Sequence, residues 1–201
     1  MKQKPTMELI FATNNRHKID EIRPLLPAAI KLRTLREAGI EQDIPEPHPS
    51  LEENAREKSI VIYNLVKTNC FSEDTGLEVR ALNGAPGVKS ARYAGENAVP
   101  EQNIQKLLAA LQNEKDRSAR FRTVISLILN GKEYQFEGIC EGRISETPSG
   151  ISGFGYDPVF IPDGATQCFA EMSLEEKQVF SHRRKATDQL VDFLLEEATK
   201  L

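Results

Sequence analysis

Apolar positions recur along the chain with two periods, one typical of strands and one typical of helices. Short apolar runs predict buried strands over Glu8–Thr13 and Asn69–Asp74, the second followed by a turn at Thr75-Gly76. Apolar residues spaced three or four positions apart predict helices over Arg16–Leu26 and Pro100–Leu111. A last helix is predicted from a stripe made of Ala186, Leu190, Phe193 and Leu194.

Capping and turn residues divide the chain further. Capping boxes at Ser50–Glu53 and Ser173–Glu176 each predict a helix start, the first helix running to about Lys67. Asn130-Gly131 between two apolar runs is a strong hairpin signal, joining Arg120–Asn130 to Glu133–Gly142. Loops are predicted at the proline-rich and glycine-rich segments Asp43–Ser50, Asn83–Val88 and Gly150–Gly155.

Helices that alternate with strands, together with one hairpin, predict an α/β fold with a mixed central β-sheet flanked by helices. The 201 residues suit one compact domain, 7–201, after a short polar tail at 1–6. Hydrophobic residues make up 39% and charged residues 28%, which excludes a disordered chain or a coiled coil.

Charge and cysteine content narrow the class of partner. The 26 basic and 30 acidic residues give a net charge of −4, which argues against a general nucleic-acid or membrane binder. No apolar stretch approaches the ~18 residues of a membrane span. Three scattered cysteines form no disulfide framework, so we expect a reducing cytoplasm. Three equally scattered histidines make a zinc site improbable on spacing.

The first candidate site lies between the first strand and the first helix. A helix N-terminus presents free N–H groups and partial positive charge, which suit a phosphate. Polar and basic side chains surround this point; they are Thr13, Asn14, Asn15, Arg16, His17 and Lys18. An ordinary strand–turn–helix corner is an equally simple interpretation, and no GK[ST] phosphate-binding loop is present.

The second candidate is Lys58, which falls on the apolar stripe of its predicted helix with Leu51, Ala55 and Ile62. A lysine at such a position needs a partner or a route to water. Its side chain either reaches phosphates or carboxylates, or extends along the helix to solvent.

The third candidate is the acidic pair Glu73-Asp74, expected at a strand end, with Glu46 in the proline-rich loop. Ligands bind at the strand ends of α/β sheets, and carboxylate oxygens suit Mg²⁺. A solvated acidic turn is the plain alternative.

The fourth candidate joins a glycine-flanked aromatic loop to a basic helix start. Glycines on both sides of Phe154 allow its ring to be presented for stacking on a base. Basic residues at a helix N-terminus oppose the helix dipole, which favours an anionic or carbonyl partner. Core packing and a solvated helix start are the alternatives. The residues of this candidate are Phe154, Gly155, Tyr156, Asp157, Lys177, His182 and Arg183.

Seven motifs in order resemble the inosine triphosphate pyrophosphatase family over nearly the whole chain. They are Thr13-x-Asn15-x-x-Lys18, Glu53-Asn54-Ala55-x-x-Lys58, Glu73–Leu77, Gly84–Gly87, Ser90–Tyr93, Gly153–Pro158 and Ser181–Arg183. The resemblance implies a two-lobed domain with a substrate cleft, and a cytoplasmic homodimer that needs Mg²⁺. The implied reaction converts ITP, dITP or XTP to the monophosphate and pyrophosphate.

The resemblance also implies roles for the candidate residues. Asp74 would ligate the metal and activate water, with Lys58 as the second catalytic residue and Glu46 and Glu73 as further metal ligands. Residues 13–18 would hold the phosphates and Thr75 would contact substrate. The aromatic loop, Lys177, His182 and Arg183 would bind the base and sugar.

This chain departs from the family at Glu73, where many bacterial members have Asp, and at Asn14, where Gly is frequent. Two other functions stay open. One is a related pyrophosphatase that acts on other modified nucleotides, such as pyrimidines; the other is a non-enzymatic nucleotide or RNA binder.

Overall fold

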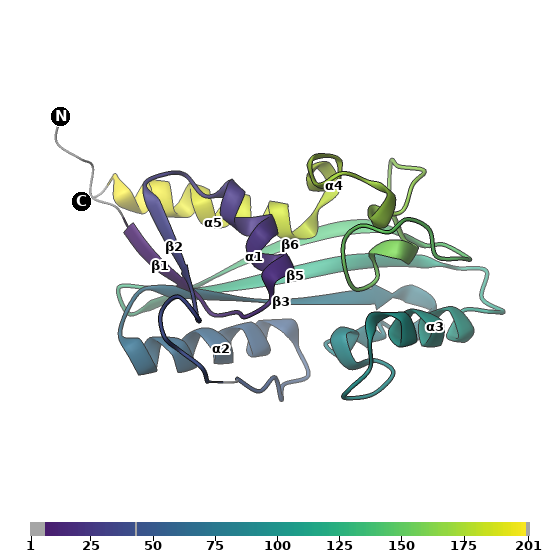
Figure 1. Ribbon diagram of the computed structural model, residues 1–201, viewed down its shortest axis with the longest axis horizontal. Coiled ribbons are helices and arrows are strands. Elements are labelled where there is room, and N and C mark those ends of the chain that lie inside the picture. The colour runs from purple at the N-terminus through teal and green to yellow at the C-terminus, as the bar shows by residue number, and fades with distance from the viewer. Residues whose placement is uncertain (1–6, 43, 200–201) are drawn as a thin grey trace. The chain divides into compact units, whose positions relative to one another are not determined.

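The computed structural model describes residues 7–42 and 44–199, so the expected tail at 1–6 lies outside the described residues. The strands are β1 (Met7–Phe11), β2 (Ile30–Thr34), β3 (Cys70–Val79), β4 (Pro86–Gly87), β5 (Ser118–Leu129), β6 (Lys132–Ile144) and β7 (Phe160–Pro162). The helices are α1 (Arg16–Ile22), α2 (Leu51–Val66), α3 (Pro100–Ala110), α4 (Leu174–Phe180) and α5 (His182–Ala198), shown in Figure 1.

The strands form one mixed sheet in the order β2-β1-β3-β5-β6-β7, and β4 pairs with β3. β1 runs parallel to β2 and to β3, whereas β4 and β7 are antiparallel to their neighbours. The predicted fold class is therefore confirmed. The expected hairpin is also present, because Asn130 (φ 51°) and Gly131 (φ 78°) take the left-handed conformation that a two-residue turn requires.

The chain divides into two compact units. Unit 1 comprises the chain up to Asp74, Val124–Glu137 and the chain from Arg183 onward; unit 2 comprises Thr75–Thr123 and Gly138–His182. β3, β5 and β6 each contribute residues to both units. A cleft between two lobes stays a prediction.

The core of unit 1 has two layers because side chains alternate along its strands. Leu9, Phe11 and Phe71 face α1 and α5, where they pack with Ile22 and Leu190. The intervening residues face the other way. Ile10 and Cys70 pack with Ile62 of α2.

Unit 2 has its own core. Leu77 and Val79 of β3 pack with Leu107 of α3 and with Phe121 of β5. Phe121 lies 4.6 Å, ring centroid to centroid, from Phe160. Within the described residues, no helix has both the length and the apolar character that crossing a membrane demands.

Several boundaries differ from the sequence predictions: the first strand ends at Phe11 rather than Thr13, and the first helix at Ile22 rather than Leu26. The difference that bears on the site is in β3. β3 does not end at Asp74 but continues through Thr75-Gly76 to Val79. Gly76 is a point of close approach rather than a turn, because a Cβ there would lie 2.7 Å from the carbonyl oxygen of Gly87. Glu73 and Asp74 therefore lie in the middle of a strand.

Candidate functional site

The extension of β3 decides where its two acidic residues point. Successive side chains of a strand face opposite sides, so Glu73 follows Phe71 and Asp74 follows Ser72. The Ser72 hydroxyl donates to the Ala55 carbonyl of α2. Asp74 accordingly faces α2, and Glu73 faces α1 and α5.

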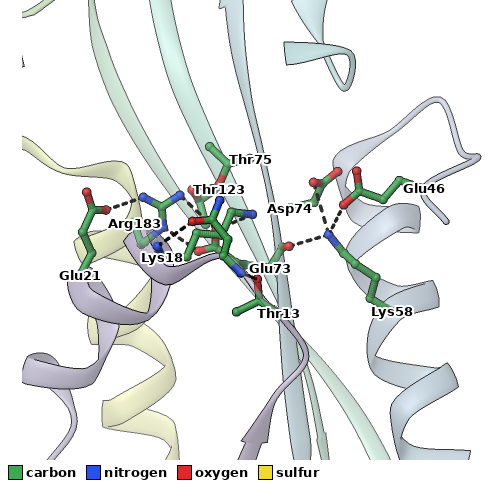
Figure 2. A network of polar contacts seen from close by, with 11 residues as sticks. Thr13, Lys18, Glu21, Glu46, Lys58, Glu73, Asp74, Thr75, Thr123 and Arg183 are labelled. Atoms are coloured by element: carbon green, nitrogen blue, oxygen red, sulfur yellow. Dashed lines mark hydrogen bonds and ion pairs between the residues drawn. The ribbon is translucent and has the colours of Figure 1, made fainter. Parts of the chain in front are cut away.

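Asp74, Lys58 and Glu46, here called the Asp74 cluster, meet on the α2 side of the sheet (Figure 2). Lys58 Nζ lies 2.5 Å from Glu46 Oε1 and 3.5 Å from Asp74 Oδ1. The same ammonium donates to the backbone carbonyl of Glu73 at 2.7 Å. Lys58 is only 7% exposed, which confirms its predicted place on the buried stripe and gives it partners there.

Burial and neighbouring charges shift the pKa values of Asp74 and Lys58. Burial raises the pKa of Asp74, and the nearby Glu46 charge adds to that rise. Lys58 lowers this pKa, with smaller contributions from Lys18 and the Asn54 amide, but the net direction is upward. Burial alone would lower the pKa of Lys58, but Asp74 and Glu46 outweigh it, so that pKa is raised. The cluster thus keeps a charged lysine beside a carboxylate that is more basic than usual.

The donor set fits Mg²⁺. Asp74 Oδ2 is buried and accepts no hydrogen bond from any described residue, so one carboxylate oxygen is available to a cation. Mg²⁺ commonly takes one or two protein carboxylates and completes its shell with water and phosphate oxygens. No group of three His, Cys, Asp or Glu side chains able to hold a metal occurs in the described part of the chain. Asp74 and Glu46 would therefore supply a Mg²⁺ site rather than a closed protein cage.

Glu73 belongs to a different group, the Arg183 network, made of Lys18, Glu21, Glu73 and Arg183 (Figure 2). Arg183 donates through Nε to Glu73 Oε2 at 2.8 Å and through Nη2 to Glu73 Oε1 at 3.0 Å. Its Nη1 donates to Glu21, and Lys18 Nζ lies 2.9 Å from Glu73 Oε1. Burial would raise the pKa of Glu73, but Arg183 and Lys18 hold it well below its usual range.

This network changes two sequence-based expectations. Glu73 faces away from the Asp74 cluster and both its oxygens accept from cations, which argues against Glu73 as a metal ligand. Arg183 is 2% exposed, with its guanidinium held by two carboxylates. Its contact with a nucleotide base stays a prediction that this geometry does not favour.

The loop before α1 presents the expected polar side chains to solvent. Asn15 caps the helix by accepting from the Lys18 N–H at 3.3 Å, and its own N–H donates to Thr13 Oγ1 at 3.1 Å. No acidic residue lies in the first turn of α1. The exposed side chains here are those of Asn14, Asn15, Arg16 and His17. Lys18 is less exposed than these residues and reaches Glu73.

In unit 2, Asp157 joins the aromatic loop to α4, and we call Phe154, Asp157 and Lys177 the Phe154 cluster. Asp157 Oδ2 accepts from Lys177 Nζ at 2.7 Å and from the Phe154 N–H at 2.9 Å. Lys177 Nζ also lies 5.1 Å from the Phe154 ring centroid. Gly153 permits this arrangement, since a Cβ there would lie 2.1 Å from Asp157 Oδ2.

Other predicted residues of unit 2 are partly or wholly buried. The Tyr156 hydroxyl donates to the Ser90 carbonyl at 2.9 Å, and burial raises its pKa. His182 stacks on Phe121 with centroids 4.7 Å apart. Thr75 Oγ1 lies 2.6 Å from Thr123 Oγ1. The structure thus brings Phe154, Asp157 and Lys177 together, whereas Tyr156 and His182 contribute to packing.

Sequence reasoning missed Glu21, and it missed the contact between Gly153 and Asp157. Glu21 is 8% exposed although nothing in the spacing of its helix sets it apart from the solvated Asp20 beside it. Gly153 was expected only to free the aromatic ring, whereas the structure uses it to admit a carboxylate. The signal available for it was the aspartate four positions later.

Comparison with known proteins gives a consistent result. Residues 9–193 match the model of the Ham1 family. The dITP/XTP pyrophosphatases of Flavobacterium johnsoniae and Porphyromonas gingivalis are each 50% identical, with 94% of this chain and 98% and 97% of theirs covered. A HAM1 protein structure from Coxiella burnetii superposes with a TM-score of 0.88 at 38% identity, covering 95% of this chain and all of the other. This chain belongs to the Ham1 family.

Proposed function

We propose that this protein hydrolyses non-standard purine nucleoside triphosphates, namely ITP, dITP and XTP, to the monophosphate and pyrophosphate. The observation that carries the proposal is the Asp74 cluster, in which a buried carboxylate of raised pKa lies beside a charged lysine. Relatives named dITP/XTP pyrophosphatase, at 50% identity over nearly the whole chain, support the same activity.

The reaction adds one water across the bond between the α- and β-phosphates. A carboxylate can take the proton that water loses as it attacks, and a raised pKa makes Asp74 a better acceptor than an ordinary aspartate. Lys58 supplies a positive charge that offsets the developing charge on the phosphates. Lys18 and the polar side chains at 13–17 would hold the remaining phosphate oxygens.

We propose Mg²⁺ as the cofactor, held by Asp74 and Glu46. When bound, it would neutralise phosphate charge and polarise the phosphoryl group under attack. Asp74 offers a carboxylate oxygen that has no hydrogen-bond donor among the described residues, and Glu46 forms an ion pair with the same lysine, Lys58.

The Phe154 cluster would select the base. Phe154 offers a ring for stacking, which every purine can use. Lys177 can only donate hydrogen bonds, so it suits the carbonyl at purine position 6 of hypoxanthine and xanthine and opposes the amino group of adenine. Guanine carries the same carbonyl, so GTP must be rejected by contacts at purine position 2.

A nucleotide panel tests the activity. We expect release of one pyrophosphate per ITP or XTP, dependent on Mg²⁺, with kcat/KM for ITP at least about 100-fold above that for ATP. Greater turnover of pyrimidine triphosphates would assign the protein to a different pyrophosphatase. Nucleotide binding without pyrophosphate release would refute an enzymatic role.

We further propose that the protein acts in the cytoplasm as a homodimer, as the family resemblance implies. Sedimentation at several protein concentrations measures the assembly, and a mass of one chain at working concentration would contradict it. Fractionation of cells with an antibody against the chain measures the compartment.

A further inference from the structure

A buried side chain of α2, that of Asn54, hydrogen-bonds the loop that carries Glu46. Pro45, Pro47 and Pro49 alternate in this loop, and proline has no N–H, so the segment cannot form a regular ladder. The His48 N–H donates to Asn54 Oδ1 at 2.9 Å, and Asn54 Nδ2 donates back to the His48 carbonyl at 3.1 Å. Asn54 is fully buried. The Asn54 amide therefore hydrogen-bonds both backbone polar groups of His48.

This double hydrogen bond bears directly on the Asp74 cluster. His48 is two residues from Glu46, whose carboxylate reaches Lys58 Nζ at 2.5 Å. Asn54 and Lys58 are four residues apart on α2, so they share one face of that helix. Asn54, which hydrogen-bonds the loop, and Lys58, which pairs with the Glu46 carboxylate, are thus neighbours on the same helix.

Unit 2 contains a second buried asparagine that bonds a loop backbone in the same way, and this residue supplies a matched control. Asn103 is the fourth residue of α3, as Asn54 is the fourth of α2, and is 4% exposed. Its Oδ1 accepts from the Ala94 N–H at 2.7 Å, and its Nδ2 donates to the Ala91 carbonyl at 3.1 Å. It stabilises a loop that carries no member of the Asp74 cluster.

We propose that Asn54 is a positioning residue of the pyrophosphatase reaction, acting by holding the Glu46 carboxylate beside Lys58 and Asp74. The inference rests on the proposed function. The Asn54 amide also acts on Asp74 directly, where it lowers the pKa of that carboxyl. The proposed role differs from a purely structural one because most of the contribution of Asn54 to turnover passes through Glu46. Removing Glu46 must therefore remove most of the effect of removing Asn54.

A double-mutant cycle on the full chain tests this dependence. The variants are Asn54→Ala, Glu46→Gln and their combination, with Asn103→Ala alone and combined with Glu46→Gln as the control. The readouts are kcat and KM for ITP, and the rise in melting temperature on adding MgCl₂ against NaCl of equal ionic strength.

We expect Asn54→Ala to lower kcat by about 10- to 100-fold, the scale of a small misplacement, with a smaller change in KM. The double variant should be within about threefold of the worse single variant, and Asn54→Ala should halve the MgCl₂-induced melting shift or more. Asn103→Ala should lower the melting temperature, and its effect on kcat should multiply with that of Glu46→Gln. Multiplying effects for Asn54→Ala and Glu46→Gln, with an unchanged MgCl₂ shift, would overturn the proposal.

A second pair of variants covers the case in which Asn54→Ala does not fold. His48→Pro removes the N–H that Asn54 accepts and leaves Asn54 itself intact, whereas His48→Ala keeps the N–H. We expect His48→Pro to reproduce the loss of kcat and His48→Ala to stay within threefold of the parent; equal behaviour of the two would overturn the proposal. If the parent protein releases no pyrophosphate from ITP, the proposed function is refuted instead. The MgCl₂-induced rise in melting temperature would still show whether Asn54→Ala disturbs the loop that carries Glu46.

Discussion

The Asp74 cluster and the Phe154 cluster both centre on a buried aspartate paired with a lysine, yet the two aspartates are used differently. Asp157 Oδ2 accepts from Lys177 at 2.7 Å and from a backbone N–H. Asp74 lies 3.5 Å from its lysine, and its Oδ2 has no donor in the part of the chain that the structure describes. A carboxylate oxygen that accepts two hydrogen bonds holds its neighbours in place, whereas a buried carboxylate oxygen that accepts none can bind a cation or take a proton. The bonding of Asp157 therefore suits base recognition, and the bonding of Asp74 suits hydrolysis.

The largest expected effect is at Asp74. Asp74→Asn is nearly isosteric but removes the charge that binds a cation and accepts a proton, so kcat should fall at least about 1,000-fold. Asp188→Asn, at an exposed Arg184 pair, is the control and should leave kcat unchanged. Pyrophosphate release and thermal melting are measured together. Activity within tenfold of the parent, in a folded variant, would exclude Asp74 as the base.

Lys58→Met should lower kcat/KM for ITP at least about tenfold, because the phosphates lose a buried positive charge. It should also lower the free energy of unfolding, since Asp74 and Glu46 lose the cation between them. Lys31→Met, at an exposed pair with Glu8, is the surface control. If Lys58→Met keeps the parental kcat/KM, Lys58 has a structural role and no catalytic one.

The Arg183 network should matter for stability more than for chemistry. Glu73→Gln leaves the buried Arg183 guanidinium with only one of its two carboxylate partners. This should lower the free energy of unfolding, measured in urea, by about 3–5 kcal/mol. Glu8→Gln, at a half-exposed pair with Arg33, should lower the free energy of unfolding by less than about 1 kcal/mol. Equal costs for the two variants would contradict the assignment.

The same network predicts a pH dependence. The pKa of Glu73 is lowered in the folded chain, so its contribution to stability is complete above the unfolded value of about 4.3. That contribution should decline as pH falls below about 4.3 toward the folded pKa. The free energies of unfolding of the parent and Glu73→Gln, measured in urea from pH 7 to pH 3, should approach each other below about pH 4.3 without meeting, because the folded pKa lies lower still. Parallel curves would contradict the prediction.

Gly153→Ala should disturb the Phe154 cluster, because its Cβ would lie 2.1 Å from Asp157 Oδ2. We expect KM for ITP to rise about tenfold. Gly155→Ala is a matched control, since its φ of +61° is also left-handed but no atom lies within 4 Å of its Cβ. Equal effects would attribute the loss to backbone strain rather than to the displaced carboxylate.

Much of the fold was predictable because the patterns are local. The capping boxes at Ser50 and Ser173 begin helices where expected, and the Asn130-Gly131 turn joins two long strands. The end of β3 was mispredicted, because nothing in the sequence shows that the backbone of Gly87 lies against Gly76. That single error also grouped Glu73 with Asp74, since the alternation of a continuing strand separates them.

The candidate site was predictable only in part, for a similar reason. Lys58 stood out because a charge on an apolar stripe needs a partner. Glu21 and Arg183 pair across 162 positions of sequence, so no local pattern connects them. The sequence shows that Arg183 can donate hydrogen bonds to an anion or a carbonyl. Only the tertiary structure shows that the acceptors are the carboxylates of Glu21 and Glu73.

The central claim is that the Asp74 cluster performs hydrolysis for any base, while the Phe154 cluster chooses the base. The ratio of kcat/KM for ITP to that for ATP, measured in Lys58→Met and Lys177→Met with enzyme in excess, tests it most directly. Lys58→Met should lower both values by similar factors and preserve the ratio, whereas Lys177→Met should narrow the ratio at least about tenfold. A ratio that changes in Lys58→Met and survives in Lys177→Met would contradict the account.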